Sequence, residues 1–107
     1  MILDDIVRRT EERVALLENE PVHGGVPRSG MGLSEAIVSA GYRHAVIAEI
    51  KPASPSSGTL STDPAIEAIA EAYVRGGCTA LSVVTEPFYF GGNIENISRA
   101  RSVADVP

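Results

Sequence analysis

The 107 residues carry nine basic and fourteen acidic side chains, which gives a formal net charge of −5 at pH 7. No cluster of lysine and arginine is present to neutralise phosphates, so nucleic acid is not an expected partner. Hydrophobic residues make up 44% of the chain, but none of the apolar runs approaches the ~20 residues that a membrane span needs. These properties are typical of a cytoplasmic protein without a membrane partner, and the acidic first residues do not resemble a secretory signal.

The first forty residues predict a helical extension. Residues 1–19 form a charged stretch in which apolar positions recur at heptad-like spacing, and this pattern predicts an amphipathic helix. Residues 21–32 are rich in proline and glycine and predict a loop, and a short second helix over 33–40 would begin at Ser34. The expected apolar face of the first helix comprises Leu3, Val7, Thr10, Val14 and Leu17.

An apolar run, AVIAEI over 45–50, predicts a strand that breaks into the loop KPASPSSG. Glu49 and Lys51 lie two positions apart, so strand geometry directs both side chains to one face. In a parallel barrel that face is the interior, and catalytic side chains gather at the carboxyl ends of its strands. Two interpretations are open at this point: an active-site pair, or a structural ion pair that lowers the cost of burying charge.

A helix is predicted over 63–75, where Asp63-Pro64 supplies a cap and a first-turn proline and Gly76-Gly77 supplies a stop. Its expected apolar face consists of Ile66, Ile69, Ala70, Tyr73 and Val74. A second strand, TALSVVT over 79–85, follows and leads into Glu86-Pro87 and three aromatic residues. Strand, helix and strand in this order predict a parallel crossover unit and an α/β fold.

A further helix is predicted from about Asn93 to Ala104, where apolar residues again recur at helical spacing. The residues on that spacing are Ile94, Ile97, Ala100, Val103 and Ala104.

Several other residues carry weaker signals. Cys78, the single cysteine, is interpreted as a small buried residue because no histidine lies near it in the sequence. His23 and His44 lack metal-ligand spacing, so no metal site is predicted. The segment 54–58, SPSSG, could by composition equally be a flexible linker, although the charged pair just before it favours a functional loop.

These motifs together resemble the indole-3-glycerol phosphate synthase family of the tryptophan pathway. The pattern IAEIK-x-x-SPS-x-G at 47–58 is similar to the family's first-strand signature. The runs G-G-x-x-A-x-S-V-x-T-E at 76–86 and Y-F-x-G at 89–92 are similar to its second strand and the loop after it. The resemblance covers roughly 2–107 and is strongest after Gly41. It departs from the family at Pro52, where a basic residue is common.

The resemblance implies a (β/α)₈ TIM barrel with an extra N-terminal helical segment. Residues 1–40 would be that extension, and 41–107 would be the first two βα units. Because a complete barrel needs about 250 residues, we expect the chain to be the N-terminal portion of such a barrel. Val106-Pro107 would then stand at the threshold of a third strand.

The implied activity is that of a lyase, which closes the ring of 1-(2-carboxyphenylamino)-1-deoxyribulose 5-phosphate to give indole-3-glycerol phosphate with loss of CO₂ and water. It needs no cofactor, and its partner is a phosphorylated small molecule. Carried over by position, Glu49 and Lys51 would be catalytic and Ser54 would hydrogen-bond the substrate. Pro55 and Phe90 would wall its aromatic ring.

The family's other catalytic and phosphate-binding residues would follow residue 107, so we expect the 107 residues alone to be inactive. We also expect them to self-associate or to need the missing barrel half. Two alternatives remain: a sister phosphate-binding barrel enzyme of the same pathway, which the SPS after AEIK disfavours, and a non-catalytic half-barrel assembly module.

Overall fold

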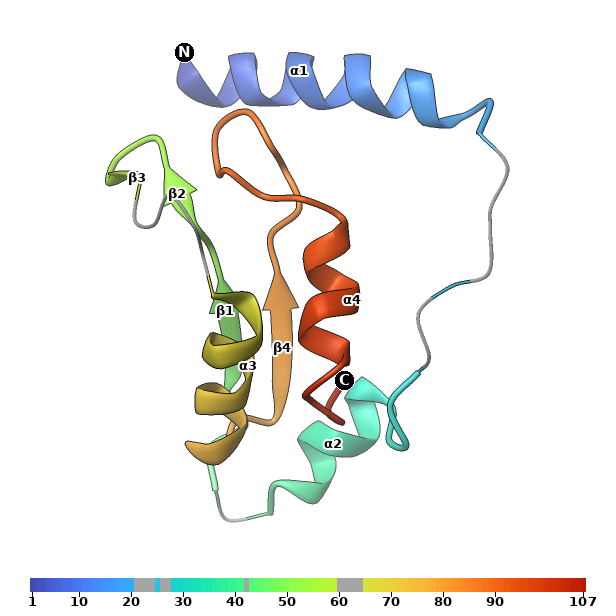
Figure 1. The fold of residues 1–107 in the computed structure, drawn as a ribbon, viewed down its shortest axis with the longest axis vertical. Coiled ribbons are helices and arrows are strands. Elements are labelled where there is room, and N and C mark those ends of the chain that lie inside the picture. Colours follow the sequence, from blue (N-terminus) through green and yellow to red (C-terminus); the bar gives the residue numbers. More distant parts are fainter. Residues whose placement is uncertain (21–24, 26–27, 42, 60–64) are drawn as a thin grey trace.

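A computed structural model describes residues 1–20, 25, 28–41, 43–59 and 65–107 of the chain. Helices and strands are mixed along the sequence (Figure 1). In chain order the elements are α1 (Ile2–Leu17), α2 (Leu33–Ser39), β1 (Ile47–Ile50), β2 (Ala53–Ser54), β3 (Gly58–Thr59), α3 (Ile66–Arg75), β4 (Ala80–Val83) and α4 (Glu95–Arg101).

Strands β1 and β4 pair in parallel, with α3 as the crossover between them, so the predicted strand–helix–strand unit is confirmed. The ladder reaches beyond the strand bounds, because the Thr79 amide donates to the Val46 carbonyl at 2.8 Å and the Val84 amide donates to the Ile50 carbonyl at 3.1 Å. Extended pairing therefore covers most of the predicted strands 45–50 and 79–85. The fold class is α/β, as expected.

The core lies between the strand pair and the two helices that follow its strands. Its buried members are Ile50, Ile66, Ala70, Ala100 and Ala104. Ile66 is completely buried, which is worth about 1.5–3 kcal/mol for a side chain of this size. The predicted apolar face of α3 is confirmed, since its remaining members pack against this cluster. The Asp63-Pro64 start predicted for this helix lies outside the described residues.

Helix α4 is shorter than predicted. It begins at Glu95, whose amide donates to the Asn93 side-chain oxygen at 2.9 Å. Ala100 and Ala104 are buried as expected, but Ile94 is 69% exposed and the neighbouring Asn96 is buried instead. The prediction for Ile94 was wrong because this residue precedes the helix and does not share its inner face.

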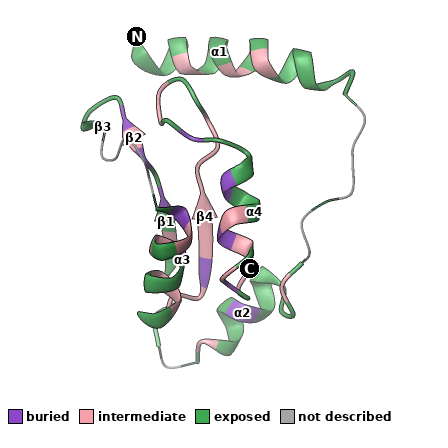
Figure 2. Cartoon of the chain, in the orientation of Figure 1, coloured by how far each residue is buried: buried purple, intermediate pink, exposed green. Residues whose placement is uncertain are grey.

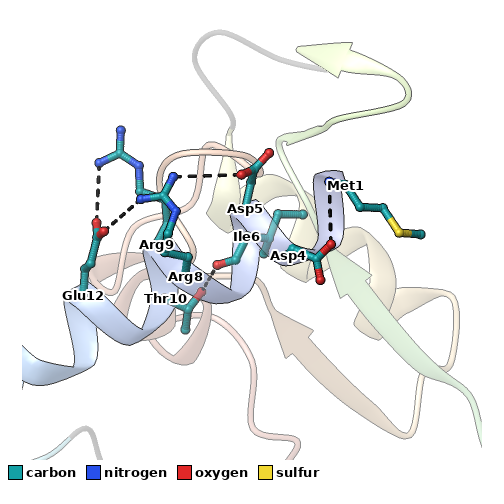
Figure 3. Close-up of polar contacts among 8 residues, drawn as sticks. All are labelled: Met1, Asp4, Asp5, Ile6, Arg8, Arg9, Thr10 and Glu12. Atoms are coloured by element: carbon teal, nitrogen blue, oxygen red, sulfur yellow. Dashed lines mark hydrogen bonds and ion pairs between the residues drawn. The ribbon is translucent and has the colours of Figure 1, made fainter.

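Helix α1 runs across the carboxyl ends of β1 and β4 (Figure 1) and contains no buried residue (Figure 2). The helix itself is confirmed, but its predicted apolar face stays largely open to solvent. The half-buried positions of the helix are Ile6, Thr10 and Arg13. Its surface carries ion pairs between side chains three or four residues apart, such as Arg8 with Glu12 at 2.9 Å (Figure 3). Such pairs stabilise helices by about 0.2–0.5 kcal/mol each.

Helix α2 begins one residue before the predicted Ser34. The Ala36 amide donates to the Gly32 carbonyl at 2.9 Å and closes the first turn, so Gly32 is the cap and Leu33 the first helical residue. Nearby, the Gly30 amide donates to a carboxylate oxygen of Asp105 at 3.2 Å. This bond connects the segment before α2 to the C-terminal end of the chain.

The SPSSG segment forms the turn of a small antiparallel hairpin and is not a linker. Strands β2 and β3 pair Ala53 with Thr59 and Ser54 with Gly58. Gly58 has a φ of +65°, a conformation that costs glycine little. The loop after β1 therefore has a defined shape at the carboxyl end of the strand pair.

Residues 104–107 lie along the edge of β4 that β1 does not occupy. The Leu81 amide donates to the Pro107 carbonyl at 2.9 Å. The Arg101 guanidinium holds this segment by donating to the carbonyls of Ala104 and Val106, at 3.1 and 2.6 Å. A single strand-like bond forms here, and a third strand remains a prediction.

Candidate functional site

Two loops meet at the carboxyl ends of β1 and β4. One is the 51–59 segment that contains the β2–β3 hairpin, and the other is the 84–94 segment between β4 and α4. Helix α1 lies across the same end of the structure (Figure 1). All five residues proposed from the sequence as site residues belong to this end, in β1 or in one of the two loops.

The register of the strand pair brings Glu49 opposite Ser82. The Ser82 hydroxyl donates to one carboxylate oxygen of Glu49 at 3.5 Å, and the Lys51 ammonium lies 3.6 Å from the other. The core residues Ile50 and Val83 are out of phase with Glu49 and Ser82 along the strands. Glu49 and Ser82 therefore lie on the sheet face that α3 and α4 do not cover.

The Glu49–Lys51 pair is accessible in the structure, with side chains 48% and 39% exposed. Exposed ion pairs contribute about 0–1 kcal/mol to stability, so a stabilising role does not by itself explain the presence of Glu49 and Lys51 at this strand end. The backbone at Glu49 is nevertheless fixed, because the Tyr73 hydroxyl of α3 donates to the Glu49 carbonyl at 2.9 Å. The arrangement leaves an ammonium group available to an anionic ligand, with a carboxylate beside it.

Ser54 is buried and shapes the hairpin turn. Its hydroxyl oxygen accepts a hydrogen bond from the Ser57 amide at 3.1 Å and lies 3.4 Å from the Ser56 hydroxyl. Pro55, by contrast, is exposed in the turn. The serine oxygen is thus held in place by the turn itself, and Pro55 offers an apolar surface beside it.

The second loop turns around the carboxylate of Glu86. Its two oxygens accept hydrogen bonds from the amides of Phe88, Tyr89 and Phe90, at 2.9, 2.7 and 3.1 Å. The Phe90 carbonyl accepts a bond from the Ala53 amide at 3.0 Å. The structure therefore joins the loop of Phe90 to the loop of Ser54 through the backbone.

Sequence reasoning placed Glu86 at the end of a strand and gave it no role. The signal available was a glutamate before proline and an aromatic run, which indicates a turn without showing which amides the carboxylate reaches. Ser82 and Tyr73 were missed for a related reason. Their partner Glu49 lies 33 and 24 residues away in the sequence.

Cys78 is partly buried, and this burial raises the pKa of its thiol. A raised pKa disfavours the thiolate that a nucleophile or metal ligand requires. Within the described ranges, no three His, Cys, Asp or Glu side chains are grouped so that they could hold a metal ion. Among the described helices, none has the length and apolar character needed to cross a membrane.

Comparison with known proteins gives a family match over nearly the whole chain. The family model described as indole-3-glycerol phosphate synthase matches residues 3–107. The chain belongs to the indole-3-glycerol phosphate synthase family. The resemblance found in the strand and loop motifs is thereby confirmed.

Several curated relatives named indole-3-glycerol phosphate synthase match nearly all of this chain. The protein from Sulfurimonas denitrificans is 34% identical over 117 positions, which cover 100% of this chain and 44% of the relative. That from Rippkaea orientalis is 40% identical, over 94% of this chain and 34% of the relative. That from Methanopyrus kandleri is 40% identical, over 98% and 41% respectively. The chain thus spans less than half the length of these relatives.

Proposed function

We propose that this chain contributes the N-terminal part of an indole-3-glycerol phosphate synthase. The complete enzyme would close the ring of 1-(2-carboxyphenylamino)-1-deoxyribulose 5-phosphate with loss of CO₂ and water. The observation that carries the proposal is the family match over residues 3–107. The position of Lys51 and Glu49 at a carboxyl strand end supports it, because enzymes built on parallel barrels place their chemistry there.

The proposed architecture is a (β/α)₈ barrel preceded by residues 1–40. Two features support it. The helices α3 and α4 pack on one face of β1 and β4, so the face with Glu49 and Ser82 would become the barrel interior. The far edge of β4 already accepts a neighbour, through the bond from the Leu81 amide to the Pro107 carbonyl.

Lys51 is the proposed contact for the anionic or hydroxyl end of the substrate. Its ammonium has three donors and no acceptor, so it can bind an oxyanion or give a proton to an oxygen as the carbon–carbon bond forms. The Glu49 carboxylate, 3.6 Å away, would hold the ammonium in place beside the reacting groups. Ring closure, decarboxylation and dehydration move protons and eliminate small molecules, so the reaction itself calls for no redox cofactor.

Ser54, Pro55 and Phe90 are the proposed substrate-binding residues. The Ser54 oxygen accepts the Ser57 amide, which leaves its O–H free to donate to a carboxylate of the substrate when it turns away from Ser56. Pro55 and Phe90 would cover the two sides of an aromatic ring. Burial of such a ring contributes roughly 1–3 kcal/mol.

The test uses the complete enzyme, meaning these 107 residues together with the remainder of a family barrel. The remainder comes from the reading frame that contains them or from the Methanopyrus kandleri relative. We expect the purified enzyme to release CO₂ and indole-3-glycerol phosphate in equal amounts. A folded complete enzyme that yields neither product would contradict the proposed function.

A further inference from the structure

The carboxylate of Glu86 binds three successive amides of its own loop, and Glu86 has no part in the proposed substrate contacts. Both oxygens are engaged, one by the Phe88 amide and the other by the amides of Tyr89 and Phe90. Hydrogen bonds to an ionised acceptor are stronger than neutral ones. A carboxylate used in this way is poorly placed to act as a general base toward a ligand.

The same loop is fixed at its far end by close backbone approach. The Gly92 amide donates to the Glu86 carbonyl at 2.8 Å, which closes the loop on itself. A Cβ atom on Gly92 would press against the Val84 carbonyl oxygen and lie 2.7 Å from the Thr85 carbonyl carbon. Gly91, at a φ of +62°, lies close to Pro52 and Ala53 of the hairpin loop.

Apolar burial accounts for only part of the order of this loop. Phe88 at its tip is 58% exposed, and its ring is covered on one side by the Arg9 guanidinium of α1, 4.8 Å from the ring centre. Tyr89 and Phe90 are only partly buried, so the hydrogen bonds to Glu86 are a substantial part of what holds residues 88–90 in one conformation. Those residues end at Phe90, whose carbonyl is bonded to Ala53 in the loop of Ser54.

We propose that Glu86 is a positioning residue that sets the place of Phe90 beside the Lys51–Ser54 loop. It would act through the loop backbone, without touching the substrate. This inference rests on the proposed function, because Glu86 would position Phe90, which is the residue proposed to cover the aromatic ring of the substrate. It predicts that Glu86 matters for substrate binding only as long as Phe90 is present.

The first measurement tests the hydrogen bonds between the Glu86 carboxylate and the amides of residues 88–90. Glu86→Gln keeps the size of the side chain but leaves a single acceptor oxygen and places an NH₂ group against a backbone amide. In the complete enzyme we expect hydrogen exchange of the Phe88, Tyr89 and Phe90 amides to accelerate by about tenfold. Glu71→Gln, on the exposed surface of α3, removes the same charge and should leave those rates unchanged. Unchanged exchange in Glu86→Gln would overturn the proposal.

The second measurement is a double-mutant cycle with Phe90→Ala. For Glu86→Gln we expect KM to rise by about tenfold with a smaller change in kcat, as for loss of uniform binding. Glu86→Asp retains the carboxylate and should recover part of that loss. In the Phe90→Ala background, Glu86→Gln should change KM by less than about twofold, because interacting residues are not additive.

The outcomes separate this inference from the proposed function. A complete enzyme that folds but is inactive would contradict the proposed synthase function. The exchange rates of the amides of residues 88–90 would still test whether Glu86 holds the loop. Equal effects of Glu86→Gln with and without Phe90 would show a general loss of structure and would overturn the positioning role. If Glu86→Gln fails to fold, the double-mutant cycle with Phe90→Ala is measured with Glu86→Asp instead. Additive effects of Glu86→Asp and Phe90→Ala on KM would overturn the proposal.

Discussion

The Lys51 ammonium and the Glu49 carboxylate lie 3.6 Å apart on the open side of the strand pair, with both side chains accessible to solvent. The charge of Lys51 should therefore matter more for a ligand than for folding. We predict that Lys51→Met in the complete enzyme lowers kcat/KM by at least about 100-fold, which corresponds to about 2.7 kcal/mol of transition-state stabilisation. Steady-state kinetics and thermal unfolding, measured on the same preparation, test the two halves of this prediction.

The matched control is Arg75→Met in the last turn of α3, where an exposed positive charge is removed away from the carboxyl ends of the strands. Its turnover should stay close to that of the parent enzyme. If Lys51→Met retained near-normal kcat/KM, the structural ion-pair interpretation would be the better account of Glu49 and Lys51.

Helices α3 and α4 are joined by Glu67 and Arg99, whose side chains form two hydrogen bonds of 2.8 and 2.7 Å. The hydrogen bond from Arg99 is the main cause that lowers the pKa of Glu67 from 4.5 to about 2. A lowered carboxyl pKa in the folded state stabilises the protein above the unfolded value and loses that effect as the pH falls toward the folded value. We predict that Glu67→Gln is less stable than the parent at pH 7 and that the difference shrinks between pH 4.5 and 2.

Urea unfolding of the complete enzyme and of its Glu67→Gln variant at a series of pH values measures this effect. Glu71→Gln on the same helix serves as the control, since it removes a carboxylate from an exposed position. A difference between the parent and Glu67→Gln that stayed constant from pH 7 to 2 would show that the ion pair does not contribute in the manner described.

Gly92 is the tightest glycine position of the 84–94 loop. An added Cβ would lie 2.7 and 2.8 Å from the Thr85 carbonyl carbon and Cα, and neither atom can move without shifting the strand end. We predict that Gly92→Ala destabilises the complete enzyme by about 1–3 kcal/mol, the range found for overpacking. Gly25→Ala is the control, because a Cβ there meets no atom within 4 Å. Equal unfolding midpoints for the two variants would contradict the close approach at Gly92.

The elements that periodicity predicted are those whose packing depends on local spacing. Ile66 and Ala70 fall one helical turn apart, so they mark the buried face of α3 whatever its partner. The register that brings Ser82 to Glu49 depends on two segments 33 residues apart, and no local pattern fixes it. The strand end that carries Glu49 and Lys51 was therefore predicted from the sequence, while the contacts of Glu49 with Ser82 and Tyr73 became visible only in three dimensions.

Helix α1 and Glu86 show which contacts the sequence pattern could not predict. The repeat of apolar residues showed that α1 is amphipathic, but a repeat says nothing of what covers the apolar face, and in this structure that face is largely open. For Glu86, the sequence indicated a turn. Which amides the carboxylate reaches depends on the turn geometry of residues 87–90, and that turn is also joined to a different loop by the hydrogen bond from the Ala53 amide to the Phe90 carbonyl.

The isolated 107 residues expose more surface than a compact protein of their size. Their accessible area is 7579 Å², whereas a folded monomer of this mass exposes about 5,700 Å². The radius of gyration is 15.3 Å, against about 13 Å for a compact chain of roughly this length. Part of the excess is apolar, since Ile47 on the open sheet face is 52% exposed.

We predict that the isolated chain self-associates or remains partly molten, because two parallel strands with an open face and open edges invite further pairing. It should also show no synthase turnover, since the residues that would complete the proposed site would lie in the rest of the proposed barrel. Sedimentation velocity, calorimetry and a turnover assay on one host-free preparation test both statements. Adding the complementary part of a family barrel should reduce self-association and restore activity together. A monodisperse 11.3 kDa species with a cooperative thermal transition would argue against the first statement, and turnover above background would argue against the second.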